Sequence, residues 1–291
     1  MRLVNPTELI AERLGDVEAV RMLKRAGFDA IDWSFFEMTA GHGVFCTDAW
    51  KEHALDLKAA ADEVGIPFSQ AHAPFPSSNG VEPYDTLIVE RIVRSMEVCS
   101  ILGVKNIVVH PKQHLTYAAH AQELFEQNVA FYKELIPHAE RLNVRICTEN
   151  MWQYDSLRGC IVPSVCADPK EFCALIDAVD SPYLAACLDV GHCALTGYDI
   201  PAFIRTLGKD RLKALHIHDV DYRSDNHTLA FQQKLPWEEI MAALAEIGYE
   251  GDLTFEANNF VKNLPDALLE PACTFMAQTG HYLISRIEKN K

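Results

Sequence analysis

The sequence CLDVGHCALTGYDI, residues 187–200, joins an apolar segment to a pair of polar side chains. Residues 184–188 are apolar throughout, which is typical of a buried strand. Asp189 and His192 come next, three residues apart, and small residues with Gly197 follow them. An apolar strand that ends in a carboxylate and an imidazole is unusual for a simple core strand, and the same arrangement recurs along the chain.

Short apolar runs alternate with longer segments of helical periodicity. Amphipathic segments such as 16–27, 49–65 and 236–248 lie between the runs, and several stop at a glycine, as in RAGFDA, EVGIPF, ILGVKN and EIGYEG, which is a common end signal for a helix. The runs with strand character are MRLV (1–4), AIDWSF (30–35), PFSQAHAP (67–74), KNIVVHP (105–111), VRICTEN (144–150), AACLDVGH (185–192), KALHIHDV (213–220) and DLTFEAN (252–258).

Strands that alternate with helices predict a parallel sheet. Eight such units in 291 residues most simply close into a single (β/α)8 TIM barrel, which typically takes about 250 residues. No linker or low-complexity segment divides the chain, so we expect one domain over residues 1–291. An open doubly wound sheet is the alternative, but no Gly-x-Gly-x-x-Gly follows the first strand and no Walker-type loop is present.

The composition is that of an ordinary globular protein, with 49% hydrophobic and 23% charged residues. A net charge of −15 disfavours a general polyanion ligand, although a local basic rim could override that total. The chain lacks the roughly 18 unbroken apolar residues of a membrane helix, and its N-terminus lacks a signal-peptide core. Nine scattered cysteines without a C-x-x-C pair favour reduced thiols. We expect a cytoplasmic protein with no membrane or nucleic-acid partner, and a homo-oligomer remains open.

Side chains that can bind metals close the predicted strands from the third onward. They are His72, His110, Glu149, Asp189, His192, His216, His218 and Glu256, joined by Asp225 and His227 from the loop after the seventh strand. In a barrel, the C-terminal ends of the strands share one rim. Imidazole and carboxylate together suit Zn²⁺, Mn²⁺ or Fe²⁺, and buried acids are costly without cations. The sequence therefore predicts a divalent-metal site at this rim.

Each of these residues also has an ordinary explanation when it is taken alone. Asp189 could cap the helix that follows it, and either glutamate could pair with a basic neighbour. Six other histidines lack such a pattern and are expected to pack or face solvent: His42, His53, His114, His120, His138 and His281. The long polar connection at 151–169 is predicted to cover the active site.

The segments CLDVGHCALTGYD, HIHD and TFEAN resemble the xylose isomerase-like barrel superfamily, which contains sugar isomerases and epimerases and also endonuclease IV. The resemblance covers nearly the whole chain from about the second strand. Similarity to the ketose 3-epimerases implies a single metal ion with these ligands: Glu149, Asp189, His216 and Glu256. His216 is preferred to His218 because HIHD, with Asp219, fits the family pattern His-x-x-Asp.

The same resemblance implies a substrate contact for His192. His218 points the same way along the strand as His216, and we expect it to contact substrate as well. The epimerases carry an acid six residues after their first glutamate, where this chain has Asp155, and an arginine six residues after the metal histidine. Tyr222 takes that second position here, with Arg223 next to it, so the identity of the substrate stays open. Trp152, in the loop after the fifth strand, is also expected to bind substrate.

Endonuclease IV uses nine ligands for three zinc ions, and every matching position is filled here. The matching residues are His72, His110, Glu149, Asp189, His192, His216, Asp225, His227 and Glu256. Other endonuclease motifs are broken: its Asn-Asp is His218-Asp219, its tyrosine in H-x-x-Y is Phe75, and its Gly-x-Gly is absent. In the endonuclease those positions lie on loops that meet DNA.

The leading hypothesis is a divalent-metal sugar or sugar phosphate isomerase or epimerase, with zinc or manganese favoured and more than one ion open. Glu149 and Glu256 transfer a proton beside a polarised carbonyl, while His192 and His218 hydrogen-bond the developing oxyanion. Proton return to the same face isomerises the sugar, and return from the opposite glutamate epimerises it. The alternatives are a multi-zinc phosphodiesterase and a metal-stabilised barrel without catalysis. Candidate phosphate ligands are Arg158, Arg223 and Lys234.

Overall fold

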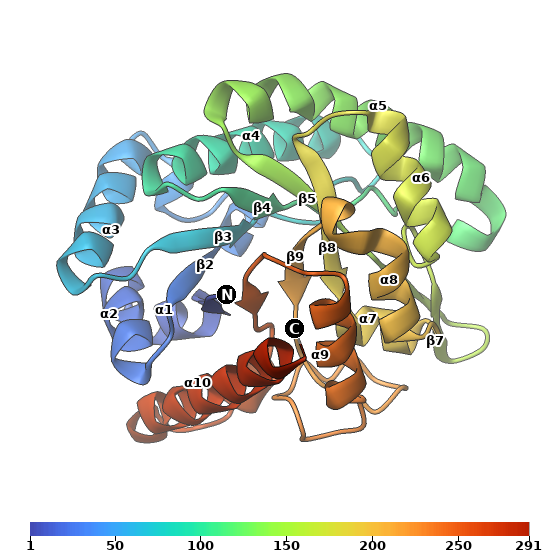
Figure 1. Ribbon diagram of the computed structural model, residues 1–291. Helices are drawn as coiled ribbons and strands as arrows, with labels where there is room; N and C mark the ends of the chain where they lie inside the picture. The colour runs from blue at the N-terminus through green and yellow to red at the C-terminus, as the bar shows by residue number, and fades with distance from the viewer. Residues whose placement is uncertain (291) are drawn as a thin grey trace.

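Eight parallel strands form a barrel in the computed structural model, which describes residues 1–290 (Figure 1). The strands are β1 (Leu3–Pro6), β2 (Ala30–Ser34), β3 (Phe68–His72), β4 (Asn106–Val108), β5 (Arg145–Glu149), β8 (Leu184–Asp189), β9 (Leu212–His216) and β10 (Leu253–Thr254). Their order is β10-β1-β2-β3-β4-β5-β8-β9, and a parallel bridge between Ile217 and Phe255 joins the two ends. The predicted (β/α)8 barrel is confirmed.

The helices lie outside the barrel because each presents an apolar face to the strands (Figure 1). In chain order they are α1 (Glu8–Leu14), α2 (Asp16–Ala26), α3 (Trp50–Val64), α4 (Tyr84–Leu102), α5 (Tyr117–Leu142), α6 (Pro169–Val179), α7 (Val190–Leu195), α8 (Ile200–Arg211), α9 (Trp237–Glu246) and α10 (Asp266–Lys289). Three 3₁₀ turns are also present: η1 (Phe36–Ala40), η2 (Val44–Cys46) and η3 (Asn258–Phe260). The predicted helical segments 16–27, 49–65 and 236–248 correspond to α2, α3 and α9.

Two kinds of side chain fill the inside of the barrel. Small apolar residues of β4, β5, β8 and β9 pack together on one side: Val108, Cys147, Ala185, Cys187 and Ala214. Buried polar residues occupy the other side, where Gln70 Nε2 donates to Asp32 Oδ2 over 3.3 Å and Thr254 Oγ1 donates to Gln70 Oε1 over 3.2 Å. Because the interior is packed, a ligand can enter only at a rim.

The parallel register brings the C-terminal ends of the strands to one level. Ser34 is paired with His72, and Asp189 is paired with His216. Glu149 is paired with Cys187, two residues before Asp189. The polar residues that end these strands therefore gather at a single rim, as predicted.

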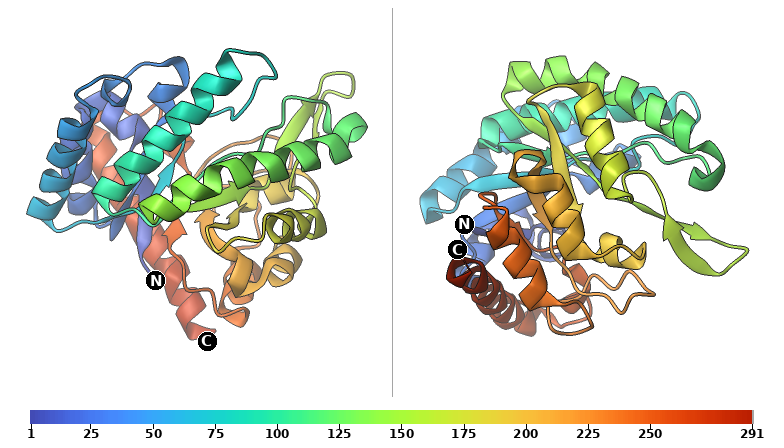
Figure 2. Two further views of the ribbon diagram at one scale, coloured as in Figure 1. Left: turned by 90° about the horizontal axis from the view of Figure 1, so that it is seen from above. Right: turned by 45° about the vertical axis from the view of Figure 1, so that its right-hand side comes forward.

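The connection after β5 folds into an antiparallel hairpin of β6 (Trp152–Asp155) and β7 (Cys160–Pro163). Figure 2, in its right-hand view, shows this hairpin extending away from the barrel. Leu157 at the tip is 99% exposed. Asp155 closes the turn by accepting hydrogen bonds from the N–H groups of Leu157 (2.9 Å) and Arg158 (3.0 Å). Only the base of the hairpin therefore lies beside the rim.

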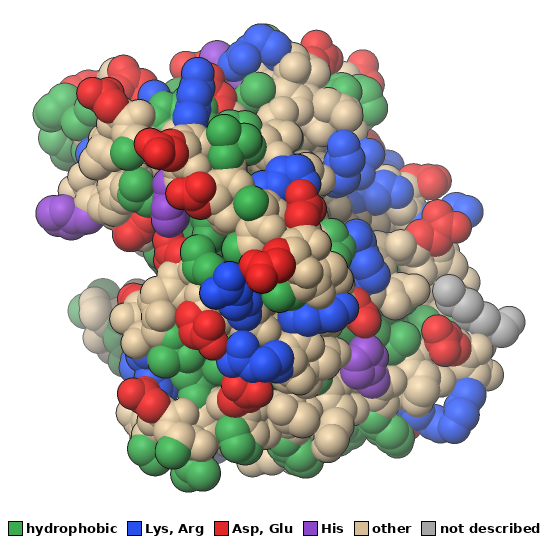
Figure 3. Space-filling view, turned by 90° about the vertical axis from the view of Figure 1, so that its left-hand side faces the viewer, with side chains coloured by type: hydrophobic (Ala, Val, Ile, Leu, Met, Phe, Trp, Pro, Cys, Tyr) green, Lys and Arg blue, Asp and Glu red, His purple; other side chains and the backbone are tan. Residues whose placement is uncertain are grey.

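Charged side chains of both signs are interspersed on the outer helices (Figure 3). Arg25 on α2 contacts both Glu18 and Glu270 at 2.8 Å, and Arg21 contacts Glu63 on α3 at 2.9 Å. Exposed pairs of this kind contribute little to stability. Within residues 1–290, no helix combines the length and the apolar character needed to cross a membrane.

The contact of α10 with the barrel gives a stability prediction. A Cβ at Gly280 would lie 2.2 Å from Leu3 Cδ1 and 2.8 Å from Phe255 Cε2. Gly280→Ala gains about 1 kcal/mol of helix propensity, whereas overpacking a core typically costs about 1–3 kcal/mol. We expect the free energy of unfolding in urea to fall by about 1 kcal/mol. Gln278→Ala, at an exposed position of the same helix, is the control. A Gly280→Ala protein as stable as the wild type would contradict this packing.

Candidate metal centre

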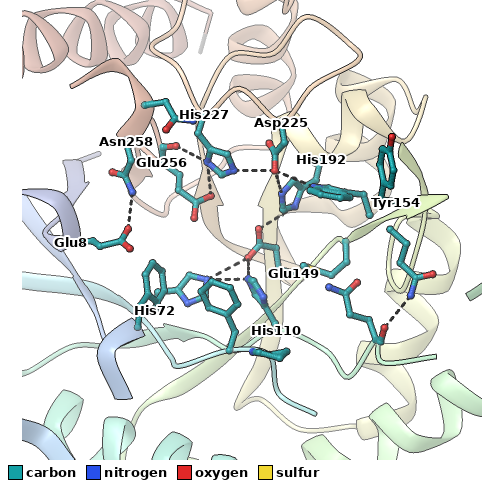
Figure 4. Close-up of a pocket in the computed structure, with 18 of the residues that line it drawn as sticks. Glu8, His72, His110, Glu149, Tyr154, His192, Asp225, His227, Glu256 and Asn258 are labelled. Atoms are coloured by element: carbon teal, nitrogen blue, oxygen red, sulfur yellow. Dashed lines mark hydrogen bonds and ion pairs between the residues drawn. The ribbon is translucent and has the colours of Figure 1, made fainter. Parts of the chain in front are cut away.

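A cavity of about 830 Å³ opens at the C-terminal rim of the barrel (Figure 4). Its floor carries Glu149 and Glu256 together with the histidines His72 and His110, and its walls include aromatic rings such as Trp152. Apolar walls with a few converging polar groups are typical of a small-molecule site. The cavity coincides with the rim at which the sequence predicted a metal.

Four residues at the centre of the rim, called the primary group here, each offer one ligand atom within 4.8 Å of the others: Glu149, Asp189, His216 and Glu256. His216 Nδ1 lies 3.2 Å from Glu149 Oε1 and 3.3 Å from Glu256 Oε2. These are the four residues for which similarity to the epimerases implied one metal ion. Their spacing fits a divalent cation bound by imidazole and carboxylate ligands.

A second set, the lower group, shares Glu149 with the primary group and adds His72 and His110. His72 Nε2 lies 3.0 Å from His110 Nε2, and His110 Nε2 lies 3.1 Å from Glu149 Oε2. Glu149 can therefore face two ions, one through each carboxylate oxygen.

A third set, the loop group, joins the loop after β9 to α7. His192, His218, Asp225 and His227 each offer an atom within 4.8 Å of the others. Asp225 Oδ2 lies 3.0 Å from His227 Nε2 and 3.5 Å from His192 Nε2. The three groups together contain every residue predicted as a possible metal ligand.

Backbone carbonyls orient three of these imidazoles. The Nδ1 atoms of His72, His192 and His227 lie 2.8 Å, 2.9 Å and 2.9 Å from the carbonyl oxygens of Ala73, Asn150 and Glu256. A carbonyl only accepts, so each Nδ1 carries a proton, and each Nε2 is the nitrogen that can bind a metal once it is deprotonated. This is the tautomer that metal-binding histidines adopt when a backbone acceptor holds the other nitrogen.

Several polar atoms in these groups are buried and have no hydrogen-bond partner. Glu149 Oε2 is one, because His110 lies close to it but in a direction that makes no hydrogen bond. Asp225 Oδ1 and Glu256 Oε2 are two more. Buried acceptors without partners are costly unless a cation binds them. The residues present therefore fit a divalent metal.

The two glutamates have opposite electrostatic environments. Burial alone raises the pKa of Glu149, but the imidazoles of His216 and His110 hold it well below its ordinary value. Burial also raises the pKa of Glu256, to about 8, and the charges of Glu149 and Asp189 add to this effect. Two carboxylates that share one site cannot both ionise easily without a cation.

The structure brings some of the predicted substrate contacts to the cavity and leaves others away from it. Trp152 lines the cavity, and its Nε1 donates to Asp225 Oδ2 over 3.1 Å. His192 also lines it. His218 is completely buried behind the wall. Asp155 lies in the hairpin turn, and the exposed Arg223 lies outside the residues that line the cavity.

Some cavity residues were missed in the sequence. Glu8 and Phe36 line the cavity directly after β1 and β2, and a search for residues that follow every strand would have found them. His114, expected to be an ordinary packing residue, also lines the cavity, where Nδ1 contacts Ser78 Oγ at 3.1 Å. The position of His114 depends on how the loop after β4 folds, and no sequence motif in that loop predicts its fold.

Comparison with models of protein families shows to which family the chain belongs. Residues 20–278 match the family model described as xylose isomerase-like TIM barrel. The chain belongs to this family. The resemblance seen in the sequence is thereby confirmed, and the barrel rim described above is the place where catalytic residues of TIM barrels lie.

Proteins with different names are similar to this chain. Fructoselysine 3-epimerase of Escherichia coli O157:H7 is 26% identical over 263 residues, covering 87% of this chain and 90% of that protein. A Bacillus licheniformis protein named "Probable endonuclease 4" is 28% identical over 230 residues, covering 74% and 70%. Among solved structures, a D-tagatose 3-epimerase-like protein superposes with a TM-score of 0.76 at 19% identity, covering 99% of both chains, which supports the fold.

Metal binding is predicted to depend on pH. Burial alone lowers the pKa of His227, but its hydrogen bond to Asp225 and the charge of Glu256 raise it to about 9. With the pKa of Glu256 at about 8, both groups hold a proton near neutral pH in the metal-free protein. Metal ligands must be deprotonated, so binding releases protons.

We therefore expect the affinity for Mn²⁺ to rise between about pH 6 and 8, by up to about tenfold per pH unit for each proton released. Calorimetric titration in two buffers with different ionisation enthalpies measures both the affinity and the proton count. An affinity that is constant or falls over this range would contradict the assignment of these ligands.

Proposed function

We propose that this protein is a divalent-metal-dependent sugar epimerase or isomerase that works by proton transfer next to a carbonyl group. The observation that carries the proposal is the pair of glutamates in the primary group, which reach one cavity from two different strand ends (Figure 4). Along the closed barrel, β5 and β10 are separated by β8 and β9, so the two carboxylates approach from different sides. The similarity to fructoselysine 3-epimerase supports this reaction class.

A divalent ion held by Glu149, Asp189, His216 and Glu256 would act as a Lewis acid that polarises the substrate carbonyl. One glutamate then removes the proton from the neighbouring carbon, and either the same or the opposite glutamate returns one. His192 lines the cavity and its Nδ1 donates to the Asn150 carbonyl, so in the protonated imidazole Nε2 can donate a hydrogen bond to the developing oxyanion.

The lining of the cavity favours an unphosphorylated sugar. Among the described residues that line it, Lys262 is the one lysine or arginine, and the carboxylate of Glu8 lines the same cavity. Arg158, Arg223 and Lys234, the candidate phosphate ligands from the sequence, do not line it. Phosphate groups are usually met by arginine, lysine or a helix N-terminus. We therefore expect free ketoses to be better substrates than ketose phosphates.

Glutamine substitutions test the proton transfer. Glu149→Gln and Glu256→Gln each keep an oxygen that can bind the metal but lose the proton acceptor. We expect metal to be retained and turnover to fall by about 10²-fold or more. Incorporation of deuterium from solvent at the substrate carbon, measured for free ketoses, reports the step directly.

Glu250→Gln is the matched control, because Glu250 is exposed at the other end of the barrel. It should leave turnover and deuterium incorporation unchanged. Full deuterium incorporation by either Glu149→Gln or Glu256→Gln would remove that residue from the proposed chemistry.

A zinc phosphodiesterase is the second candidate, and the lower and loop groups favour it. A single-metal epimerase needs neither His72 with His110 nor Asp225 with His227, yet both sets converge, and Glu149 Oε2 and Asp225 Oδ1 beside them have no hydrogen-bond partner. Clustered metal ions would supply the positive charge that a phosphodiester requires. The similarity to the protein named "Probable endonuclease 4" points the same way.

Metal content shows how many of the groups are filled, and the substrate that reacts separates the two candidates. We expect more than one equivalent of zinc per chain, and loss of about one equivalent in His110→Asn or in His227→Asn with the primary group still filled. His281→Asn, on the outer surface, is the control. Zinc-dependent cleavage of abasic DNA, together with no activity on any free ketose, would replace the epimerase with the phosphodiesterase.

A further inference from the structure

His218 lies between the primary group and the loop group, and it does not line the cavity. It is 0% exposed, and it is absent from the residues that line the cavity. Its Nε2 lies 3.0 Å from both carboxylate oxygens of Asp189 in the primary group. Its ring stacks on His227 of the loop group, with centroids 4.1 Å apart and planes within 5° of parallel.

The stack with His227 argues against His218 as a metal ligand. Distance alone admits His218 to the loop group. An imidazole lone pair lies in the plane of its ring, however, and two parallel planes do not meet at a common ion about 2 Å from each nitrogen. Of the two rings, His227 has the better position, because its Nε2 lies 3.0 Å from Asp225 and the residue lines the cavity.

Several hydrogen bonds fix the position of Asp189, and His218 makes one of them. Asp189 Oδ1 accepts from the N–H of His192 over 2.7 Å. Its backbone is tied to Asn150, which accepts from the Asp189 N–H over 2.8 Å and donates to the Asp189 carbonyl over 2.9 Å. The His218 ring is the remaining side-chain donor to the carboxylate, so it sets the direction in which that carboxylate faces the primary group.

The chain also makes room for this ring. A Cβ at Gly191 would lie 2.1 Å from His218 Cε1 and 2.5 Å from His218 Nε2. Gly191 lies in α7 and has no positive φ. Glycine at position 191 therefore leaves space for the His218 ring, and the backbone conformation does not require a glycine there. The glycine between Asp189 and His192 in the DVGH segment is explained by this contact.

We propose that His218 is a positioning residue that orients Asp189 in the primary group and, through its stack, supports His227 in the loop group. One buried side chain thus links the ligands of two metal groups. This inference rests on the metal site of the proposed function. It assigns to His218 no contact with substrate.

Binding of Co²⁺ to the full-length protein, freed of metal with a chelator, tests the inference without any enzyme assay. Visible absorption follows each equivalent, because the bands of Co²⁺ report its ligand geometry. His218→Ala removes both the donor and the ring. His218→Gln places an amide N–H close to the position of the imidazole Nε2, so it keeps a donor for Asp189 but removes the stack. Gly191→Ala keeps every metal-type residue and displaces the ring. His281→Asn, on the outer surface, is the matched control.

We expect His218→Ala and Gly191→Ala to weaken Co²⁺ binding at both groups by about 10–100-fold, the usual effect of losing a residue that orients a ligand. His218→Gln should weaken binding at the loop group and largely preserve it at the primary group. His281→Asn should bind as the wild type does. If His218→Ala does not fold, Gly191→Ala and His218→Gln carry the same comparison.

A purely structural role would lower the melting temperature of the metal-free variants and leave their Co²⁺ affinities unchanged, and that result would overturn the inference. A His218→Gln protein as weak as His218→Ala at the primary group would overturn the role of the donor to Asp189. Wild-type protein that binds no Co²⁺ at all would instead overturn the metal site of the proposed function itself.

Discussion

A carboxylate that is buried away from water needs positive charge near it. Glu149 shows this requirement clearly. Its side chain is 1% exposed, and one of its oxygens has no hydrogen-bond partner. It belongs to both the primary and the lower group. Imidazoles alone partly meet the requirement, as the lowered pKa of Glu149 shows. A divalent cation would meet it fully, and the other imidazoles and carboxylates at the rim lie where they could share such an ion.

The barrel and most of the metal-type residues could be predicted from the sequence because both depend on short-range patterns. Alternation of apolar and amphipathic segments indicated eight strands, and a parallel barrel places all their C-terminal ends together. Glu149, Asp189 and His216 each stand at the end of such a strand. Their convergence therefore needed no knowledge of the loops.

Other parts of the site could not be predicted because they depend on how loops fold and on which way a ring turns. His218 has the same strand periodicity as His216, and only the structure shows that it points at Asp189 and away from the cavity. Asp155 matches a family position, yet a tight turn holds its carboxylate. The sequence also predicted that the connection at 151–169 covers the active site. In the structure, part of this connection forms a hairpin that extends away from the barrel (Figure 2).

Anomalous X-ray scattering from crystals grown with Mn²⁺ tests the central claim most directly, because it locates the ion without any assumption about the substrate. We expect a peak bounded by Glu149, Asp189, His216 and Glu256, within about 2.0–2.3 Å of one atom from each. A peak elsewhere on the molecule with none at this position would contradict the assignment of the primary group as the metal centre.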